Sequence, residues 1–148
     1  MLSLTKIFHF EMAHAIHGYP GACKNIHGHS YELHVTVTAG KESRNYLPAP
    51  GFILDFKELK QLVASAIIQT FDHKLVLSRT YLCNNPTVIS QENLVTWNVE
   101  PTAENLLIYM QQCIREKLDN GVKLVALKLY ETKDSYAEWV YGNTFDQY

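Results

Sequence analysis

Three histidines and one cysteine lie within sixteen positions near the start of this chain, which holds only seven histidines and three cysteines in all. Residues two apart in a strand point to the same side, so His27 and His29 can present both rings to one point while Gly28 lets the backbone come close. His14 offers a third imidazole. Three nitrogen ligands with a vacant position are typical of a catalytic zinc, whereas a structural zinc is usually closed by four ligands. A lone histidine on an apolar strand face is more often a hydrogen-bonded core residue, but three together indicate a zinc-dependent enzyme.

Cys23 and the pair Asp72-His73 are the next candidates for chemistry. Most cysteines are small, inert apolar residues, but Cys23 lies in a glycine-rich loop beside Lys24, and a neighbouring cation or metal favours the reactive thiolate. Asp72 and His73 stand at the end of an expected helix, where an imidazolium is also favoured by the helix dipole. The sequence leaves capping and catalysis equally open for this pair.

The remaining candidate residues have simpler explanations. Glu104 falls in the first turn of an expected helix, where a carboxylate complements the helix dipole. Glu131 falls at the end of an expected strand and is explained by solvation. The other histidines lack a partner motif and are interpreted as structural or exposed: His9, His17 and His34.

Two alternating segments are predicted to carry the three clustered histidines. Apolar residues at the even positions of 2–14 predict a strand, and His14 falls on its apolar side. Apolar residues at the odd positions of 27–39 predict a second strand, with the histidine pair on its apolar side. Turn residues at 17–21 predict that the two strands form an antiparallel pair, whose connecting loop carries Cys23.

Two helices are predicted between this pair and the end of the chain. Asp55 and Glu58 have the spacing of a helix cap and its reciprocal partner, and an apolar stripe continues at helical spacing to about Phe71. Thr102 is the expected N-cap of the second helix, which Gly121 is expected to stop.

Strand patterns then return at 122–131 and 136–141. The order of elements predicts an α+β fold, an antiparallel β-sheet with two helices packed on one face, in a single domain over residues 1–148. Residues 74–100 are expected to be irregular apart from two short apolar pieces, as a functional or interface loop.

Composition narrows the class of protein. The 148 residues carry a formal net charge of −2, which offers no broad basic surface for nucleic acid. No apolar run approaches the roughly 20 residues of a membrane span, and the first residues lack the pattern of a signal peptide, so we expect a cytoplasmic protein away from membranes. The odd number of widely spaced cysteines favours reduced thiols over disulfides.

Six motifs follow one another along the chain: Phe10-Glu11-Met12-Ala13-His14, Cys23-x-x-x-His27-Gly28-His29-x-Tyr31, Gly51-x-x-x-Asp55-Phe56-x-x-Leu59-Lys60, Asp72-His73, Pro101-Thr102-x-Glu104-Asn105 and Glu131-Thr132. In this order they resemble the signatures of the 6-pyruvoyl-tetrahydropterin synthase family, which includes bacterial 6-carboxytetrahydropterin synthases. The resemblance runs from the first strand to the penultimate one.

The resemblance implies a tunnelling fold, in which subunits form a barrel-like trimer and two trimers stack into a hexamer with active sites between subunits. It implies zinc as the cofactor and a small pterin triphosphate as the partner. Carried over residue by residue, it implies zinc ligands at His14, His27 and His29, a catalytic thiol at Cys23 with relay partners Asp72 and His73, a pterin-anchoring carboxylate at Glu131, and a pocket residue at Glu104.

Three residues separate Cys23 from His27, a spacing that resembles the bacterial carboxy-forming branch. The resemblance thus implies conversion of 7,8-dihydroneopterin triphosphate to 6-carboxy-5,6,7,8-tetrahydropterin with release of acetaldehyde and triphosphate, a step towards queuosine-type 7-deazapurines. One alternative is 6-pyruvoyl-tetrahydropterin synthesis, which releases triphosphate alone. An alternative of a different class is a zinc- or pterin-binding assembly protein without turnover. A zinc hydrolase is disfavoured because the chain lacks a His-Glu-x-x-His helix.

The chain also departs from the family pattern. Phe71 stands where leucine is common, and residues 74–78 lack the usual Leu-Asn pair. The segment leading to Glu100 is longer than in compact bacterial members. These departures concern loop conformation and substrate entry rather than the metal site.

Overall fold

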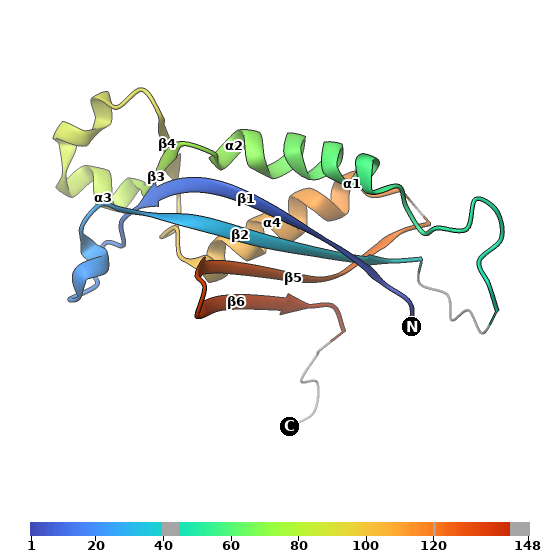
Figure 1. The fold of residues 1–148 in the computed structure, drawn as a ribbon. Helices are drawn as coiled ribbons and strands as arrows, with labels where there is room; N and C mark the ends of the chain where they lie inside the picture. The colour runs from blue at the N-terminus through green and yellow to red at the C-terminus, as the bar shows by residue number, and fades with distance from the viewer. Residues whose placement is uncertain (40–44, 120, 143–148) are drawn as a thin grey trace.

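Six strands form one sheet in the computed structural model, which describes residues 1–39, 45–119 and 121–142 (Figure 1). Their order across the sheet is β4-β3-β1-β2-β5-β6. The strands are β1 Leu4–His14, β2 His27–Thr38, β3 Lys74–Ser78, β4 Leu94–Trp97, β5 Lys123–Thr132 and β6 Ser135–Val140.

The antiparallel pair of β1 and β2 confirms the predicted hairpin and fixes the register of the histidines. His14 lies opposite His27, and Met12 lies opposite His29. Alternate residues of both strands are buried, as a half-buried pleated pair requires. The loop between them holds a short 3₁₀ turn, η1, at Ala22–Lys24, and the Ile16 N–H donates to the Cys23 carbonyl at 2.8 Å.

The last two strands extend the antiparallel part of the sheet, also as predicted: β5 pairs antiparallel with β2, and β6 pairs antiparallel with β5. Leu33 pairs with Leu129 and Glu32 with Tyr130. This register brings Glu131, near the end of β5, beside the strand that carries the histidine pair. Strand β6 pairs with β5 on the outer edge.

The prediction of an irregular segment over residues 74–100 was wrong, and the sheet is mixed rather than wholly antiparallel. Strand β3 pairs parallel with β1, and β4 pairs parallel with β3. Between them lie a helix, α3 Arg79–Asn84, and a 3₁₀ segment, η3 Pro86–Ser90. Strand β3 is buried from Leu75 to Ser78, and a short strand buried on both faces lacks the alternation that identifies one from sequence.

The two predicted long helices are present. The first consists of α1 Phe56–Val63, a π-helical segment η2 Ala64–Ile68 and α2 Gln69–Phe71, and Asp55 caps it by accepting from the Lys57 N–H at 2.8 Å. The second, α4 Ala103–Lys117, is capped by Thr102 as expected but ends before Gly121. No helix in the described part of the chain is long and apolar enough to cross a membrane.

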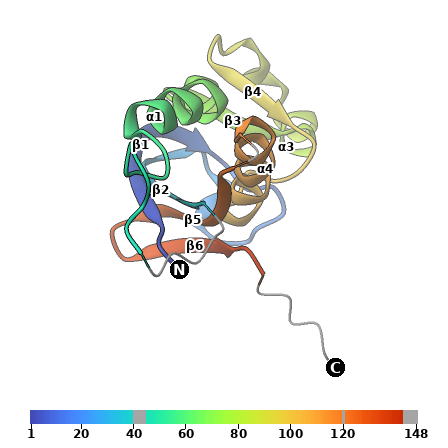
Figure 2. The same ribbon diagram turned by 90° about the vertical axis from the view of Figure 1, so that its right-hand side faces the viewer.

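Both long helices cover the same face of the sheet (Figure 2). The main apolar core lies between them and the central strands, so the α+β prediction is confirmed. Its largest fully buried side chains in β1, β2, β5 and the two helices include Phe10, Tyr31, Leu33, Leu59, Ile67, Phe71, Leu106, Met110, Ile114, Leu127 and Leu129. The histidines continue this buried face to one end of the sheet.

Candidate active site

The structure brings His14, His27 and His29 together at the end of the β1–β2 pair. One ring nitrogen from each lies within 4.8 Å of the others, and the Nε2 atoms of His14 and His27 are 3.2 Å apart. Two nitrogens bound to one tetrahedral zinc at 2.0–2.1 Å would be about 3.3 Å apart. The spacing in this structure therefore matches two ligands of a single ion.

Backbone carbonyls fix the direction of two of these rings. The Nδ1 atom of His14 lies 2.7 Å from the carbonyl oxygen of Pro101, and that of His27 lies 2.7 Å from the carbonyl oxygen of Asn25. A carbonyl can only accept, so the proton of each neutral ring is on Nδ1 and the Nε2 lone pairs face each other. Two lone pairs at 3.2 Å repel unless a cation lies between them, and this donor set fits a metal ion.

Burial favours the neutral, metal-binding form of the cluster. His14 is only 3% exposed, and desolvation lowers its pKa against the opposing effects of the Pro101 hydrogen bond and the Glu131 charge. Burial also lowers the pKa of His29. A lower pKa means that protons compete less well for the ring nitrogens.

Glu131 and Tyr31 adjoin the histidines. The Oε1 atom of Glu131 lies 3.9 Å from His14 Nε2, and the Tyr31 hydroxyl donates to the same oxygen at 3.5 Å. Tyr31 is fully buried, and its pKa is raised by burial and by the Glu131 charge, so its hydroxyl keeps its proton. The sequence places Tyr31 in a motif and on the apolar side of a predicted strand, which burial alone explains, so its contact with Glu131 was not predicted.

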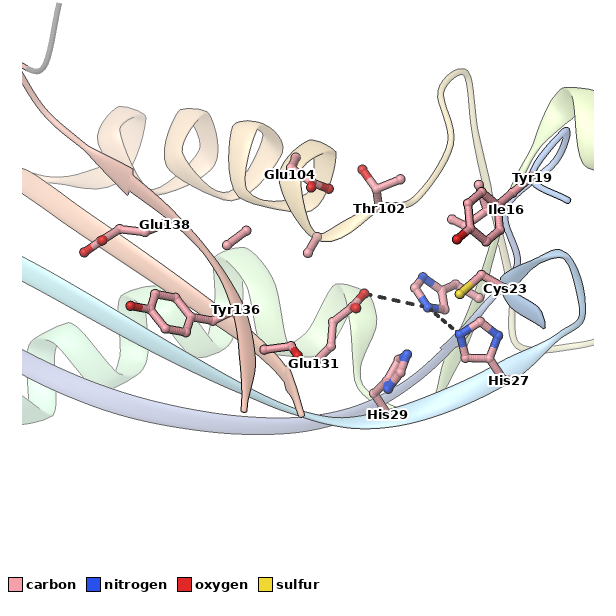
Figure 3. A pocket seen from close by; sticks show the side chains of 14 residues that line it. Ile16, Tyr19, Cys23, His27, His29, Thr102, Glu104, Glu131, Tyr136 and Glu138 are labelled. Carbon is pink, nitrogen blue, oxygen red and sulfur yellow. Dashed lines mark hydrogen bonds and ion pairs between the residues drawn. The ribbon is translucent and has the colours of Figure 1, made fainter. Parts of the chain in front are cut away.

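A cavity of about 610 Å³ joins the histidines to Cys23, Glu104 and Glu131 (Figure 3). We call it the metal cavity. Its other lining residues are Ile16, Tyr19, Thr102, Ala103, Ser135, Tyr136, Ala137 and Glu138. Cys23 is exposed. One cavity therefore collects the three-histidine cluster, a thiol and three carboxylates.

The pair Asp72-His73 lies elsewhere in the same chain. The His73 Nδ1 atom lies 3.0 Å from Asp72 Oδ1, and the same oxygen accepts from the Glu11 N–H at 2.9 Å. That hydrogen bond and His73 lower the pKa of Asp72. His73 lines a separate cavity of about 380 Å³ with Glu11 and Ser30, whose side chains are hydrogen-bonded at 2.8 Å.

The second cavity lies on the opposite face of the β1–β2 pair. Ser30 is adjacent to His29 in an extended strand, so their side chains point to opposite faces. His73 holds a left-handed backbone conformation with φ of 58° and is 78% exposed. A single chain therefore does not bring His73 to Cys23.

Glu100 links the Cys23 loop to the sheet, a role that sequence analysis missed. Its two carboxylate oxygens accept from the Ser78 hydroxyl at 2.5 Å and from the His17 N–H at 2.8 Å. The next residue, Pro101, supplies the carbonyl that orients His14. The only signal available in the sequence was a carboxylate directly before the Pro-Thr motif.

A profile of the family described as 6-pyruvoyl tetrahydropterin synthase matches residues 3–141. The chain belongs to this family. Among its curated relatives, the 6-carboxy-5,6,7,8-tetrahydropterin synthase of Haemophilus influenzae is 29% identical over 143 residues, covering 94% of this chain and 99% of the relative. The 6-pyruvoyl tetrahydrobiopterin synthase of Pongo abelii is 31% identical over 116 residues, covering 78% and 68%.

Solved structures show the same fold at low sequence identity. An uncharacterized protein from Wolinella succinogenes aligns with a TM-score of 0.75 at 18% identity, covering 95% of this chain and 98% of that one. The 6-pyruvoyl tetrahydropterin synthase of Caenorhabditis elegans aligns with a TM-score of 0.65 at 20% identity, covering 94% of both chains. The family's fold is thus present over nearly the whole chain.

Proposed function

We propose that this member of the 6-pyruvoyl tetrahydropterin synthase family converts 7,8-dihydroneopterin triphosphate to 6-carboxy-5,6,7,8-tetrahydropterin, releasing acetaldehyde and triphosphate. The observation that carries the proposal is the meeting of three histidine nitrogens, the Cys23 thiol and the Glu131 carboxylate in one cavity. Each of these groups has a task in that reaction.

The histidines would hold zinc. Their facing Nε2 lone pairs, their carbonyl-fixed rings and the burial of His14 support this assignment. A bound zinc acts as a Lewis acid that favours loss of a proton from carbon beside a bound oxygen. The role of the chain is to hold three neutral imidazoles toward one point, with room beside them for substrate oxygens.

Glu131 would anchor the pterin ring. The ring's aminopyrimidinone edge offers two adjacent N–H donors, and a carboxylate can accept both as a bidentate pair. The Tyr31 hydroxyl donates to Glu131 Oε1 at 3.5 Å and so orients the carboxylate toward the cavity. Glu104, in the first turn of α4, lines the same cavity as a further polar contact.

Cys23 would move protons at the side-chain carbons, with His73 as the second acid-base group and Asp72 orienting it. Because His73 and Cys23 occupy opposite faces of the β1–β2 pair, His73 would act on the metal cavity of a neighbouring copy. This separation supports a homo-oligomer, which we propose to be a hexamer built from two trimers. The 3.0 Å contact of Asp72 with His73 would be preserved in that arrangement.

The carboxy product is preferred over the pyruvoyl product on two grounds. Three residues separate Cys23 from His27, and the relatives named 6-carboxytetrahydropterin synthase from Haemophilus influenzae and Rickettsia typhi match over 99% of their own length. Relatives named for pyruvoyl synthesis also match this chain, over a smaller share of it. The 6-pyruvoyl product is therefore the second candidate.

The test is to incubate zinc-loaded protein with 7,8-dihydroneopterin triphosphate and to identify the pterin product by mass. The proposal requires the 6-carboxy product from the wild type and no product from Cys23→Ser at equal zinc content. A pterin that keeps all its side-chain carbons would establish the second candidate instead. Binding without turnover in the wild type would assign the chain to pterin- or zinc-binding proteins.

A further inference from the structure

A third cavity, distinct from the one that His73 lines, adjoins the metal cavity on the other side of the Cys23 loop. It has a volume of about 380 Å³, and we call it the loop cavity. Its lining residues are Ile16, His17, Gly18, Tyr19, Lys24, Asn25, Tyr81, Asn84 and Asn85. Two of these, Ile16 and Tyr19, also line the metal cavity, so the two spaces meet at these side chains.

The two cavities differ in charge. The metal cavity is lined by Glu104, Glu131 and Glu138, with no lysine or arginine among its described lining residues. The loop cavity is lined by Lys24, His17 and three asparagines, with no carboxylate among its described lining residues. With a zinc dication at the histidines, the three carboxylates still leave the metal cavity net negative, whereas Lys24 gives the loop cavity a positive charge. A triphosphate, which carries several negative charges at neutral pH, is therefore attracted more strongly by the loop cavity.

The loop cavity also adjoins the histidine cluster through Asn25. The carbonyl of Asn25 accepts from His27 Nδ1 at 2.7 Å, and Asn25 lines the loop cavity. In the view of Figure 3, Glu131 lies near His29. Cys23 and Tyr19 lie at the other end of the histidine cluster, above His27. A substrate held by its ring at Glu131 and by its side chain at the histidines therefore points its far end toward the Cys23 loop.

We propose that the loop cavity binds the triphosphate of the substrate, with Lys24 as its cationic contact. The inference rests on the function proposed above and adds the place where the phosphates are held. The Nδ2 atoms of Asn84 and Asn85 donate to the carbonyls of Thr80 and Tyr81 at 2.9 and 3.0 Å, and each nitrogen has a second hydrogen to offer.

One carboxylate, that of Glu100, contacts the wall of the loop cavity from outside it. Its oxygens already accept from the Ser78 hydroxyl and the His17 N–H, and it is not among the residues that line the loop cavity. Its bond to His17 instead holds one wall of the cavity against the sheet.

A competing cation, Lys128, lies near the opposite end of the metal cavity without lining it. Lys128 lies near Tyr136, with its Nζ 4.9 Å from the ring centroid. Its Nζ also lies 3.5 Å from a carboxylate oxygen of Glu138, so its charge is compensated. Lys128 is therefore the matched control for Lys24: it is a lysine beside the same cavity, placed at the end where the phosphates are not expected.

The experiment measures binding of inorganic tripolyphosphate to the zinc-loaded wild type, Lys24→Gln and Lys128→Gln by titration calorimetry. Any direct contact of tripolyphosphate with zinc is shared by all three proteins and cancels in the comparison, provided that their zinc contents are equal. Zinc content is therefore measured before and after each titration. Loss of a charge-assisted contact predicts about tenfold or greater weakening in Lys24→Gln and no change in Lys128→Gln. Lys24→Arg should keep most of the affinity, because it keeps the positive charge at this position.

Equal affinity of Lys24→Gln and the wild type, weakening only in Lys128→Gln, or no binding by the wild type would each overturn the inference. Kinetics give a second readout: Lys24→Gln should lower kcat/KM for the triphosphate about tenfold and leave the affinity for dephosphorylated 7,8-dihydroneopterin unchanged. A wild type that binds tripolyphosphate through Lys24 but does not turn over the pterin triphosphate would overturn the proposed function and leave the anion site standing.

Discussion

The Nε2 atoms of His14 and His27 lie 3.2 Å apart while the Nδ1 atom of each ring is held by a backbone carbonyl. This relationship determines where the protons are: each carbonyl requires a donor, so the lone pairs meet at Nε2. The arrangement is unfavourable for two neutral rings alone and favourable around a cation. The β1–β2 register, which places the two residues directly opposite each other, produces it.

Removing one of these ligands should remove the metal. His27→Ala leaves two imidazoles. Losing only a group that hydrogen-bonds to a metal ligand lowers metal affinity about 10–100-fold, so we expect the loss of a ligand itself to lower zinc affinity at least about a hundredfold. His9→Ala is the matched control, since the His9 side chain is 69% exposed and points away from the cluster. Bound zinc is measured by atomic absorption after dialysis. Full zinc content in His27→Ala would remove this residue from the ligand set.

Metal binding should survive mild acid. Burial lowers the pKa of His14 and His29 below the usual 6.5, so these rings are still neutral where an exposed histidine is half protonated. Acidification displaces a metal only when protons outcompete it, and the lowered pKa values place that competition below pH 6.5. Zinc content measured after equilibration at a series of pH values should therefore stay constant from pH 8 to about 6.5 and fall only at lower pH. Loss of zinc that begins above pH 7 would show that burial does not protect the site.

Glu131→Gln should damage pterin binding and spare the metal. The change replaces one acceptor oxygen with an amide donor that would face an N–H of the ring, which costs about 1–3 kcal/mol, or about tenfold or more in affinity. Zinc content should not change, because the three imidazoles remain. The affinity for a pterin analogue and the bound zinc are measured on one preparation, with Glu116→Gln, an exposed position on α4, as control. Unchanged analogue affinity would return Glu131 to the role of a solvated carboxylate.

Asp72-His73 and Cys23 should complement each other between copies of the chain. Cys23→Ser and His73→Ala are each expected to be inactive, but mixed oligomers contain sites that combine an intact Cys23 from one copy with an intact His73 from another. Unfolding and refolding the two variants together should restore about a quarter of wild-type activity by random assembly. Each variant refolded alone is the control. No recovery in the mixture, when both variants assemble normally, would exclude a site shared between copies.

Glu100→Ala should loosen the Cys23 loop. It leaves the His17 N–H and the Ser78 hydroxyl without their carboxylate partner. We expect kcat to fall about tenfold while zinc content and pterin-analogue affinity change little, because lost positioning of a reacting group acts on the chemical step. Glu100→Gln keeps one acceptor and should recover part of the loss. Rates of Cys23 alkylation, resolved by peptide mass with Cys83 as internal reference, check that the thiol has moved. Identical alkylation and kcat in Glu100→Ala and the wild type would contradict this role.

The sequence was sufficient for the parts of the molecule that obey a simple periodicity. Alternation along β1 and β2 placed His14, His27 and His29 on one face, and local cap chemistry placed the starts of the helices at Asp55 and Thr102. Each of these features depends on neighbours within a few residues, so one sequence contains the information.

Features that depend on contacts between distant parts of the chain could not be predicted from the sequence. Strand β3 is buried by elements on both sides and has no alternation, so its parallel pairing with β1 left no pattern. The hydrogen bond of Glu100 to His17 spans 83 residues, and that of Pro101 to His14 spans 87. The separation of His73 from Cys23 also arises only when the chain folds, because the face that each occupies is set by the sheet.

The proposed reaction is tested most directly by measuring how much acetaldehyde is released per triphosphate when the protein turns over 7,8-dihydroneopterin triphosphate. The protein is stripped of metal, divided, and assayed with and without added zinc, with His27→Ala treated in the same way. We predict equal amounts of acetaldehyde and triphosphate from the zinc-restored wild type, and neither product from the metal-free protein or from His27→Ala. Triphosphate without acetaldehyde, or turnover that does not depend on zinc, would contradict the account.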